Sequence, residues 1–149
     1  MKLRIVNKST NALPEYKTPD SSGMDLRAYL PEGSITLAPM ERKIIPTGLY
    51  MELEQGYEGQ VRPRSGCAVK QGLTVINAPG TIDADYRGEV GVPLINLSTE
   101  PQTIENGDRV AQIVFAPYAK VEEIIEVSDV SEMTDTERGA GGFGHSGKK

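Results

Sequence analysis

The sequence contains very few of the residues that hold small proteins together through covalent bonds or metals. Among 149 residues there is one cysteine, Cys67, and one histidine, His145. One cysteine cannot form a disulfide within the chain, so a hydrophobic core must stabilise the fold, and the chain is long enough to bury one. One cysteine and one histidine also cannot supply a structural zinc site. The scarcity of cysteine fits a reducing compartment, and we expect a cytoplasmic protein.

Long apolar stretches and an excess of positive charge are also missing. No run approaches the ~18 apolar residues of a membrane-spanning helix, and MKLRIVNKST at the start lacks the apolar stretch of a signal peptide. We therefore expect no membrane association. The formal net charge is −5, which argues against general nucleic-acid binding because that needs a basic surface. This charge is compatible with a phosphate ligand, since a few arginines and backbone N–H groups can hold one.

Turn-forming residues, in contrast, are frequent. The 16 glycines and 10 prolines interrupt the chain, and the short alternating runs between them predict strands. These runs are 3–7, 35–39, 42–53, 72–77, 89–97, 109–117 and 119–127. Nothing shows sustained helical spacing, and the one helix that we expect is short, near 65–71. The pattern predicts a single all-β domain, a sandwich or jelly roll.

The C-terminal segment differs from the rest in composition. Residues 128–149 are polar first and glycine-rich later, and they lack the apolar residues needed to join a core. We expect a β jelly-roll core over 1–127 and an arm over 128–149. On composition alone, this arm is either disordered or becomes ordered over a ligand.

A glycine-rich motif in this arm matches the sequence pattern of a dinucleotide-binding site but lacks the structural context of one. GAGGFG, 139–144, fits G-x-G-x-x-G, but a dinucleotide site needs a strand before it and a helix after it, and the chain ends at residue 149. Glycine-rich backbone can still approach phosphate oxygens closely. Arg138 adds a phosphate donor, Ser146 adds a hydroxyl, and Phe143 adds a flat face suited to stacking on a base.

A second basic segment, RPRSGCAVKQG over 62–72, contains Arg64 and Ser65 just ahead of the expected helix. A helix N-terminus presents free N–H groups and a partial positive charge, so it suits an anion. This segment equally favours the alternative that Ser65 only caps the helix and Arg64 is only a surface cation. We interpret Cys67 as a small buried apolar residue, because a nucleophilic thiol would need a base and His145 is the only histidine.

The segment TIDADYRGEVGV, 81–92, places Asp83, Asp85, Tyr86 and Arg87 at the start of a predicted strand. If arginines and glycines hold phosphates, a carboxylate is a poor phosphate ligand, and Asp83 fits better as a general base that deprotonates a water. Taken alone, the stretch is explained at least as well by a β-turn, in which Asp is common. Metal-ligand spacing is absent, but Mg²⁺ can bind through substrate phosphates with few protein ligands.

Five segments, taken in order, resemble the motifs of the homotrimeric dUTPases (deoxyuridine triphosphate nucleotidohydrolases). They are SGMDLRA (22–28), RPRSGCA (62–68), NAPGTIDADYRGEV (77–90), NGDRVAQIVF (106–115) and RGAGGFGHSG (138–147). The resemblance implies a distorted jelly roll (β-clip) and a homotrimer in which each arm closes over a neighbour's active site. It also implies Mg²⁺-assisted hydrolysis of dUTP to dUMP and pyrophosphate, which keeps uracil out of DNA and supplies dUMP for thymidylate synthesis.

The resemblance also implies roles for individual residues. Asp83 would activate the water that attacks the α-phosphorus, and Tyr86 would pack on the deoxyribose and block a 2′-hydroxyl. Asp25 would hold a water on Mg²⁺. The uracil edge would be read by Asn77 and by the hairpin backbone at Gly80, Thr81 and Ile82. The phosphates would contact Arg64, Ser65, Gly66 and Gln112, and the closing arm would contribute Arg138, Phe143, Gly144 and Ser146.

Two positions depart from the family motifs, and two other functions share part of the pattern. His145 stands where a small hydroxyl residue is frequent, and Cys67 where an aliphatic residue is common.

A dCTP deaminase shares the fold and parts of the second and third motifs, but its chemistry would need a catalytic Glu where this chain reads IDADYRG. A trimeric β-protein that only binds nucleotide would not need Asp83, so the presence of Asp83 favours an enzyme.

Overall fold

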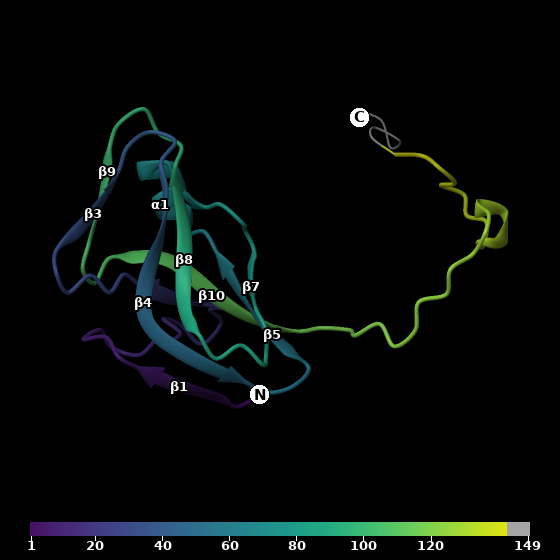
Figure 1. The fold of residues 1–149 in the computed structure, drawn as a ribbon, viewed down its shortest axis with the longest axis horizontal. Helices are drawn as coiled ribbons and strands as arrows, with labels where there is room; N and C mark the ends of the chain where they lie inside the picture. Colours follow the sequence, from purple (N-terminus) through teal and green to yellow (C-terminus); the bar gives the residue numbers. More distant parts are fainter. Residues whose placement is uncertain (143–149) are drawn as a thin grey trace. The chain divides into compact units, whose positions relative to one another are not determined.

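Antiparallel strands make up most of the regular secondary structure in this computed structural model, which describes residues 1–142 (Figure 1). The chain forms two compact units, of which the first is Met1–Ala119 and the second begins at Lys120. The strands are β1 (Leu3–Asn7), β2 (Gly23–Arg27), β3 (Ser34–Leu37), β4 (Arg42–Leu53), β5 (Tyr57–Arg62), β6 (Leu73–Val75), β7 (Gly80–Ile82), β8 (Glu89–Asn96), β9 (Gln102–Glu105) and β10 (Arg109–Pro117). The helix α1 covers Ser65–Gln71, and a 3₁₀ turn, η1, covers Val130–Glu132 in the second unit.

The strands of the first unit form three antiparallel sheets. One has the order β1-β4-β8-β6, another β2-β10-β5-β7, and β3 pairs with β9 as a small third sheet. Several neighbours are far apart in sequence, as when β10 inserts between β2 and β5. This all-β architecture confirms the fold class that the sequence predicts.

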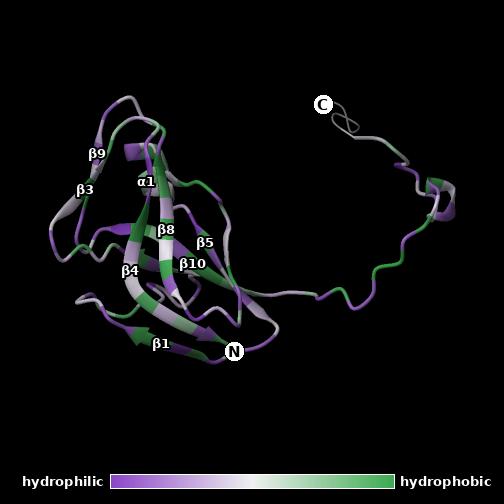
Figure 2. Cartoon of the chain, in the orientation of Figure 1, coloured by the Kyte–Doolittle hydropathy of each residue, from purple (hydrophilic) through white to green (hydrophobic). Residues whose placement is uncertain are grey.

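Alternating side chains from these sheets build one hydrophobic core. Along β8 the buried positions include Val90, Val92 and Leu94, and the intervening positions are more exposed. Strands β2, β4 and β10 add Leu26, Ile45 and Ile113, each fully buried. Figure 2 shows hydrophobic residues along much of β4, β8 and β10. Period-two alternation is what a sheet with one face on a core requires.

The predicted segments agree with the structure except at the end of the first unit. Helix α1 has the expected bounds, and strands form within six of the seven predicted runs. The run 119–127 forms no strand, and its apolar side chains at Val121, Ile124 and Ile125 are exposed. A strand needs a hydrogen-bonding neighbour, and the described chain provides none here. Strands β2, β5, β7 and β9 were not predicted, because they are short or rich in charged and glycine residues.

Two Asn-X-Ser tripeptides form the same loop at different places in the fold. The backbone N–H and hydroxyl of Ser9 donate to Asn7 Oδ1 (2.9 and 2.7 Å), and those of Ser98 donate to Asn96 Oδ1 at the same distances. Each loop packs on a glycine with positive φ, Gly48 at 70° and Gly72 at 67°. The first loop thereby supports a bulge in β4 that bears on the candidate site.

Candidate active site

The segment with Asp83 and Tyr86 forms a tight turn between β7 and β8. Strand β7 pairs with β5, with Gly59 opposite Ile82 and Val61 opposite Gly80. After Ile82 the chain turns, and the Tyr86 N–H donates to the Asp83 carbonyl (3.1 Å). The turn therefore holds the backbone of Asp83 and Tyr86 close together, and both side chains are exposed.

A cavity of about 310 Å³ opens beside this turn. Its lining includes the predicted residues Asn77, Gly80, Thr81, Ile82, Asp83 and Tyr86. Asn77 lies against Gly80 so closely that a Cβ there would be 3.1 Å from Asn77 Nδ2. An amide, exposed backbone and a carboxylate thus face one concavity, which suits the edge of a planar polar ring together with a water.

The same cavity is lined by residues that sequence reasoning missed: Ile44, Val61, Glu89, Gly91 and Pro93. Glu89 lies inside the motif 77–90 and Gly91 directly follows it, which was the one available signal. Ile44 and Pro93 gave no signal, because β4 and β8 bring them to the site only through their pairing with each other.

Ser65 and Gln112 line a second cavity of about 550 Å³, together with Ala78 and Pro79. Residues 77–80 separate this cavity from the first. Asn77 and Gly80 line the first cavity, whereas Ala78 and Pro79 line the second. The residue that precedes α1 as its cap is Arg64, without a side-chain capping bond, and Ser65 is the first helical residue. The alternative that Ser65 is only a cap is therefore wrong.

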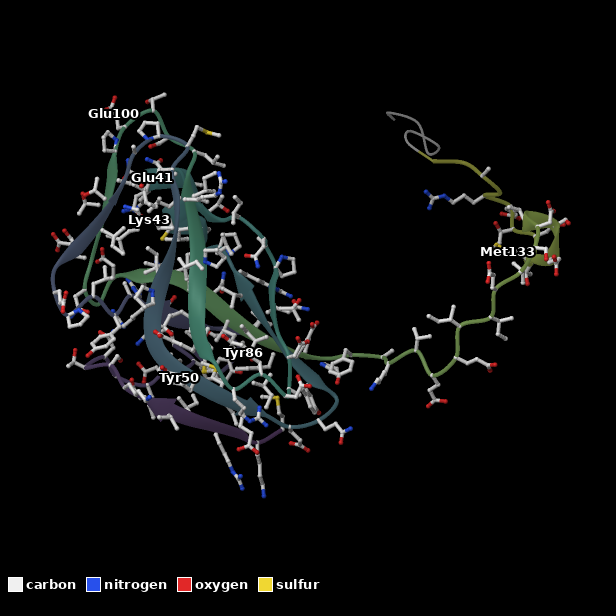
Figure 3. All side chains as sticks on the ribbon, viewed as in Figure 1. Glu41, Lys43, Tyr50, Tyr86, Glu100 and Met133 are labelled. Carbon is white, nitrogen blue, oxygen red and sulfur yellow. The ribbon has the colours of Figure 1, made fainter. Side chains whose placement is uncertain are left out.

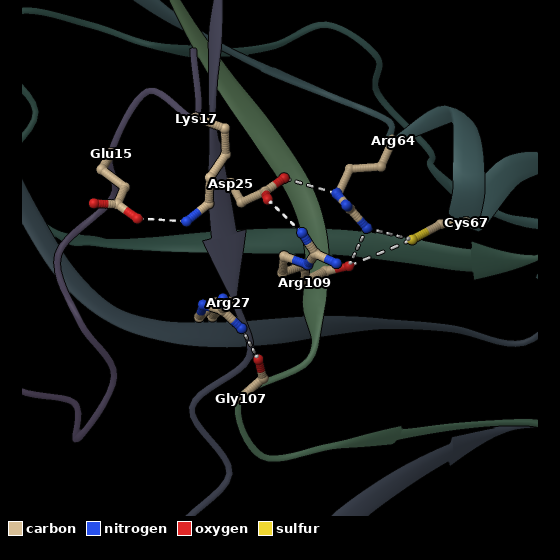
Figure 4. A network of polar contacts seen from close by, with 8 residues as sticks. All are labelled: Glu15, Lys17, Asp25, Arg27, Arg64, Cys67, Gly107 and Arg109. Carbon is tan, nitrogen blue, oxygen red and sulfur yellow. Dashed lines mark hydrogen bonds and ion pairs between the residues drawn. The ribbon is translucent and has the colours of Figure 1, made fainter. Parts of the chain in front are cut away.

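Arg64 belongs to a third group of polar residues, centred on Asp25 (Figure 4). Arg64 Nε donates to Asp25 Oδ1 (2.7 Å), and Arg109 Nη1 donates to Asp25 Oδ2 (3.3 Å). Burial alone would lower the pKa of the Arg64 guanidinium, but hydrogen bonds to Asp25 and Cys67 outweigh it and raise this pKa. The buried Cys67 thiol also donates to the Arg109 carbonyl (3.4 Å). Cys67 therefore packs in the core, as expected.

Comparison with known proteins identifies the family. A dUTPase family model matches residues 10–147. The chain belongs to the dUTPase family. It is 54% identical over 147 residues to the deoxyuridine 5′-triphosphate nucleotidohydrolase of Finegoldia magna, covering 99% of each chain. It is 56% identical over 146 residues to that of Cytophaga hutchinsonii, covering 98% of this chain and 92% of the relative. This family member is accordingly an enzyme, a nucleotide hydrolase.

Solved structures of phage dUTPases share the fold. A mutant dUTPase of Staphylococcus bacteriophage 80alpha, solved with dUpNHpp, has a TM-score of 0.86 and 25% identity, covering 98% of each chain. A mutant dUTPase from phage phi11 of Staphylococcus aureus, described with a structural Mg(II) ion, has a TM-score of 0.77 and 23% identity. It covers 87% of this chain and 98% of its own.

The residues of this dUTPase family member fit a metal held mainly by its substrate. Among residues 1–142, no group of three or more His, Cys, Asp or Glu side chains could hold a metal ion directly. Both oxygens of Asp25 accept from arginines, yet each carboxylate oxygen has a further lone pair free for a water. Asp25 therefore keeps acceptor capacity for a water, and its predicted contact with Mg²⁺ through that water stays a prediction.

The predicted arm residues fall largely outside the described part of the chain. Arg138 is described, exposed, and donates from Nε to the Gly141 carbonyl (2.8 Å). Phe143, Gly144 and Ser146, as well as His145, lie outside the described residues, so their predicted roles stay predictions. Within 1–142 no helix has the length and apolarity to cross a membrane.

Asp25→Asn should lower the free energy of unfolding by about 1–3 kcal/mol, because two guanidinium groups would lose the carboxylate that pairs them. The side chains of Asp25 and Arg64 are only 19% and 24% exposed, so solvent screens them weakly. Urea unfolding monitored by circular dichroism measures this loss. Asp85→Asn, at an exposed carboxylate, is the matched control and should change little. Equal stability of both variants would contradict a stabilising role for the Asp25 cluster.

Proposed function

We propose that this enzyme hydrolyses dUTP to dUMP and pyrophosphate. The observation that carries the proposal is the cavity beside the β7–β8 turn, where Asn77, Asp83 and Tyr86 meet. These are the residue types that reading a uracil, activating a water and packing on a deoxyribose require. The family relationship supports the same substrate, since the curated relatives are named for it.

Base selection rests on the strand β7 and the loop before it. The Asn77 side chain and the backbone at Gly80, Thr81 and Ile82 read the uracil edge by hydrogen bonds. Pairing of β7 with β5 keeps this backbone rigid, so it can exclude a 5-methyl group by shape. Exclusion by shape alone is worth only about 1–3 kcal/mol in a deformable pocket, and a rigid strand makes better use of it.

In the chemical step, Asp83 accepts a proton from the attacking water. The water oxygen forms a bond to the α-phosphorus, and the bond from that phosphorus to the bridging oxygen breaks. Pyrophosphate leaves with the electron pair of that bond. An exposed carboxylate lining the same cavity as the base-reading residues is well placed for general-base catalysis. Tyr86 packs on the deoxyribose and leaves no room for a 2′-hydroxyl.

The segment around α1 and the C-terminal arm bind the phosphates. Ser65, Gly66 and Gln112 contact phosphate oxygens from the first unit, and Gln112 is held in place by its own bond to the Pro63 carbonyl (2.9 Å). Arg64 adds positive charge next to them. Arg138 with Phe143, Gly144 and Ser146 completes the closed site, with Phe143 over the base.

Asp25 would hold Mg²⁺ through a water, with the triphosphate as the main ligand, and the ion would supply neutralising positive charge to the phosphates. Arg109 and Arg64 hold the Asp25 carboxylate in one orientation by hydrogen bonds to its two oxygens.

We further propose that the enzyme acts as a homotrimer with arm exchange. Two observations support this. The predicted phosphate and base residues line different cavities of one chain, which fits a site that a neighbouring subunit completes. The exposed apolar side chains of 119–127, among them Ile124 at 88% and Ile125 at 74%, would be covered by another subunit.

Pyrophosphate release with Mg²⁺, measured for dUTP, dTTP, dCTP and UTP, tests this proposal. We expect dUTP to be preferred over each of the others by at least about 10²-fold in kcat/KM. The rigid strand rejects the 5-methyl group of dTTP, the packed ring rejects the 2′-hydroxyl of UTP, and the hydrogen bonds that read the uracil edge do not match the amino group of dCTP. Ammonia release from dCTP would instead indicate a deaminase. Tight dUTP binding without turnover would indicate a nucleotide-binding protein, and the role of Asp83 would be withdrawn.

A further inference from the structure

The Tyr86 ring lies directly over the backbone of Gly88. A Cβ atom added to Gly88 would be 2.2 Å from Tyr86 Oη, 2.5 Å from Cζ and 2.9 Å from Cε2. All three distances are shorter than contacts that real Cβ atoms make. Any side chain at position 88 would therefore force the ring to another orientation. Figure 3 labels Tyr86 near the start of β8.

Position 88 needs a glycine because the Tyr86 ring occupies the space of a side chain, and not because the backbone there has a conformation that only glycine adopts. The glycines with positive φ in the described chain are Gly33, Gly48, Gly56, Gly72, Gly107 and Gly139, and Gly88 is not among them. An alanine could adopt the backbone conformation at position 88 without strain. The three nearest side-chain atoms that such an alanine would meet all belong to Tyr86.

Glu89 binds the same hydroxyl end of the ring. The Tyr86 hydroxyl donates to the Glu89 backbone carbonyl (3.0 Å). That carbonyl is fixed in turn, because Glu89 Oε1 accepts from the backbone N–H groups of Thr47 (3.1 Å) and Gly48 (2.7 Å). Both donors belong to the bulge in β4, where the pairing with β8 shifts register.

We propose that Gly88 and Glu89 are positioning residues that set the Tyr86 ring plane and thereby the selection of deoxyribose over ribose. Gly88 provides the space for the ring, and Glu89 ties the hydroxyl to the β4 bulge. Neither needs to touch the nucleotide. The inference rests on the proposed function, in which Tyr86 packs on the sugar.

The test compares kcat/KM for dUTP and UTP in the full-length enzyme and in Gly88→Ala. The ratio of the two values should fall at least about tenfold in the variant, because a displaced ring no longer excludes the 2′-hydroxyl. The thermal unfolding midpoint should stay close to that of the parent, since the substitution strains no backbone. In a Tyr86→Ala background, adding Gly88→Ala should change the ratio no further, because the ring that it displaces is gone.

Glu89 supplies a second, independent comparison. Glu89→Ala removes the acceptor for Thr47 and Gly48 and should lower the same ratio, whereas Glu89→Gln keeps an oxygen acceptor and should restore most of it. An unchanged ratio in Gly88→Ala, or an equal further loss in the Tyr86→Ala background, overturns the proposal.

The activity of the parent enzyme toward dUTP distinguishes failure of the proposed function from failure of the positioning role. If the parent does not hydrolyse dUTP, the proposed function fails, and the ratio of dissociation constants for dUMP and UMP, measured by calorimetry, replaces the kinetic ratio. A parent that binds dUMP more tightly than UMP and loses this preference in Gly88→Ala supports the positioning role. A parent without that preference overturns it.

Discussion

Asp83→Asn should lower kcat for dUTP by about 10²–10⁴-fold, the contribution expected of a general base that deprotonates an attacking water. Asparagine has the same shape but cannot accept the proton. Nucleotide affinity should be largely kept, because the amide still fits the exposed turn between β7 and β8. Pyrophosphate release measures the first effect, and calorimetric binding of the non-hydrolysable dUpNHpp measures the second.

The second carboxylate of the same turn gives the matched control for this experiment. Asp85 is exposed two residues further along, and it does not line the cavity that contains Asp83. Asp85→Asn should therefore retain turnover within a small factor of the parent. A near-parental rate in Asp83→Asn would show that the general-base assignment is wrong, and a loss of dUpNHpp binding would show that Asp83 acts in binding instead.

Deleting residues 137–149 should lower kcat/KM for dUTP by about 10–100-fold while leaving the fold intact. The deletion removes Arg138 and the glycine-rich motif, and one charged hydrogen bond is worth about 1.5–3 kcal/mol. The fold should persist because the buried hydrophobic residues of the described chain lie between Met24 and Ile113 in the sequence, and none of them belongs to the deleted segment. Steady-state kinetics and thermal unfolding measure the two effects separately.

Deletion of Lys148 and Lys149 alone is the appropriate control, since these two residues follow the last motif residue. It should leave kcat/KM close to the parental value. A large fall in the unfolding midpoint after removal of 137–149 would mean that the arm stabilises the protein. Unchanged kinetics after that removal would rule out an arm that closes over the substrate.

Local alternation was enough to predict the long strands. The run RKIIPTGLYMEL became β4 and RVAQIVFAP became β10 with the expected bounds. Buried side chains recur at every second residue over part of each strand, as at Leu49, Met51 and Leu53 in β4 and at Ala111 and Ile113 in β10. The three-residue strands β6 and β7 give too few alternating positions for a full prediction. Alternation also misled at 119–127, where apolar residues recur but no strand forms within the described chain.

The candidate site was predictable as a set of residues and not as an arrangement. The motif segments identified Asp83, Tyr86 and Asn77, which do line one cavity. They did not indicate that Arg109 shares Asp25 with Arg64, or that Glu89 bonds to a bulge in β4. Roles for Arg138 and the residues after it were predicted from sequence resemblance and stay predictions.

The sequence by itself determined the fold class, the family and the residue types of the site, because short-range alternation and ordered motifs are properties of neighbouring residues. Only the tertiary structure decided which side chains meet. Asp25 bonds to Arg64 and Arg109 across 39 and 84 positions, and Glu89 bonds to Thr47 across 42. Such contacts depend on which strands become neighbours in a sheet, and that is set by packing of the whole core. Tertiary structure was also needed for two residues that are close in sequence. The orientation of the Tyr86 ring over Gly88 depends on how the turn folds, so the sequence did not predict this contact.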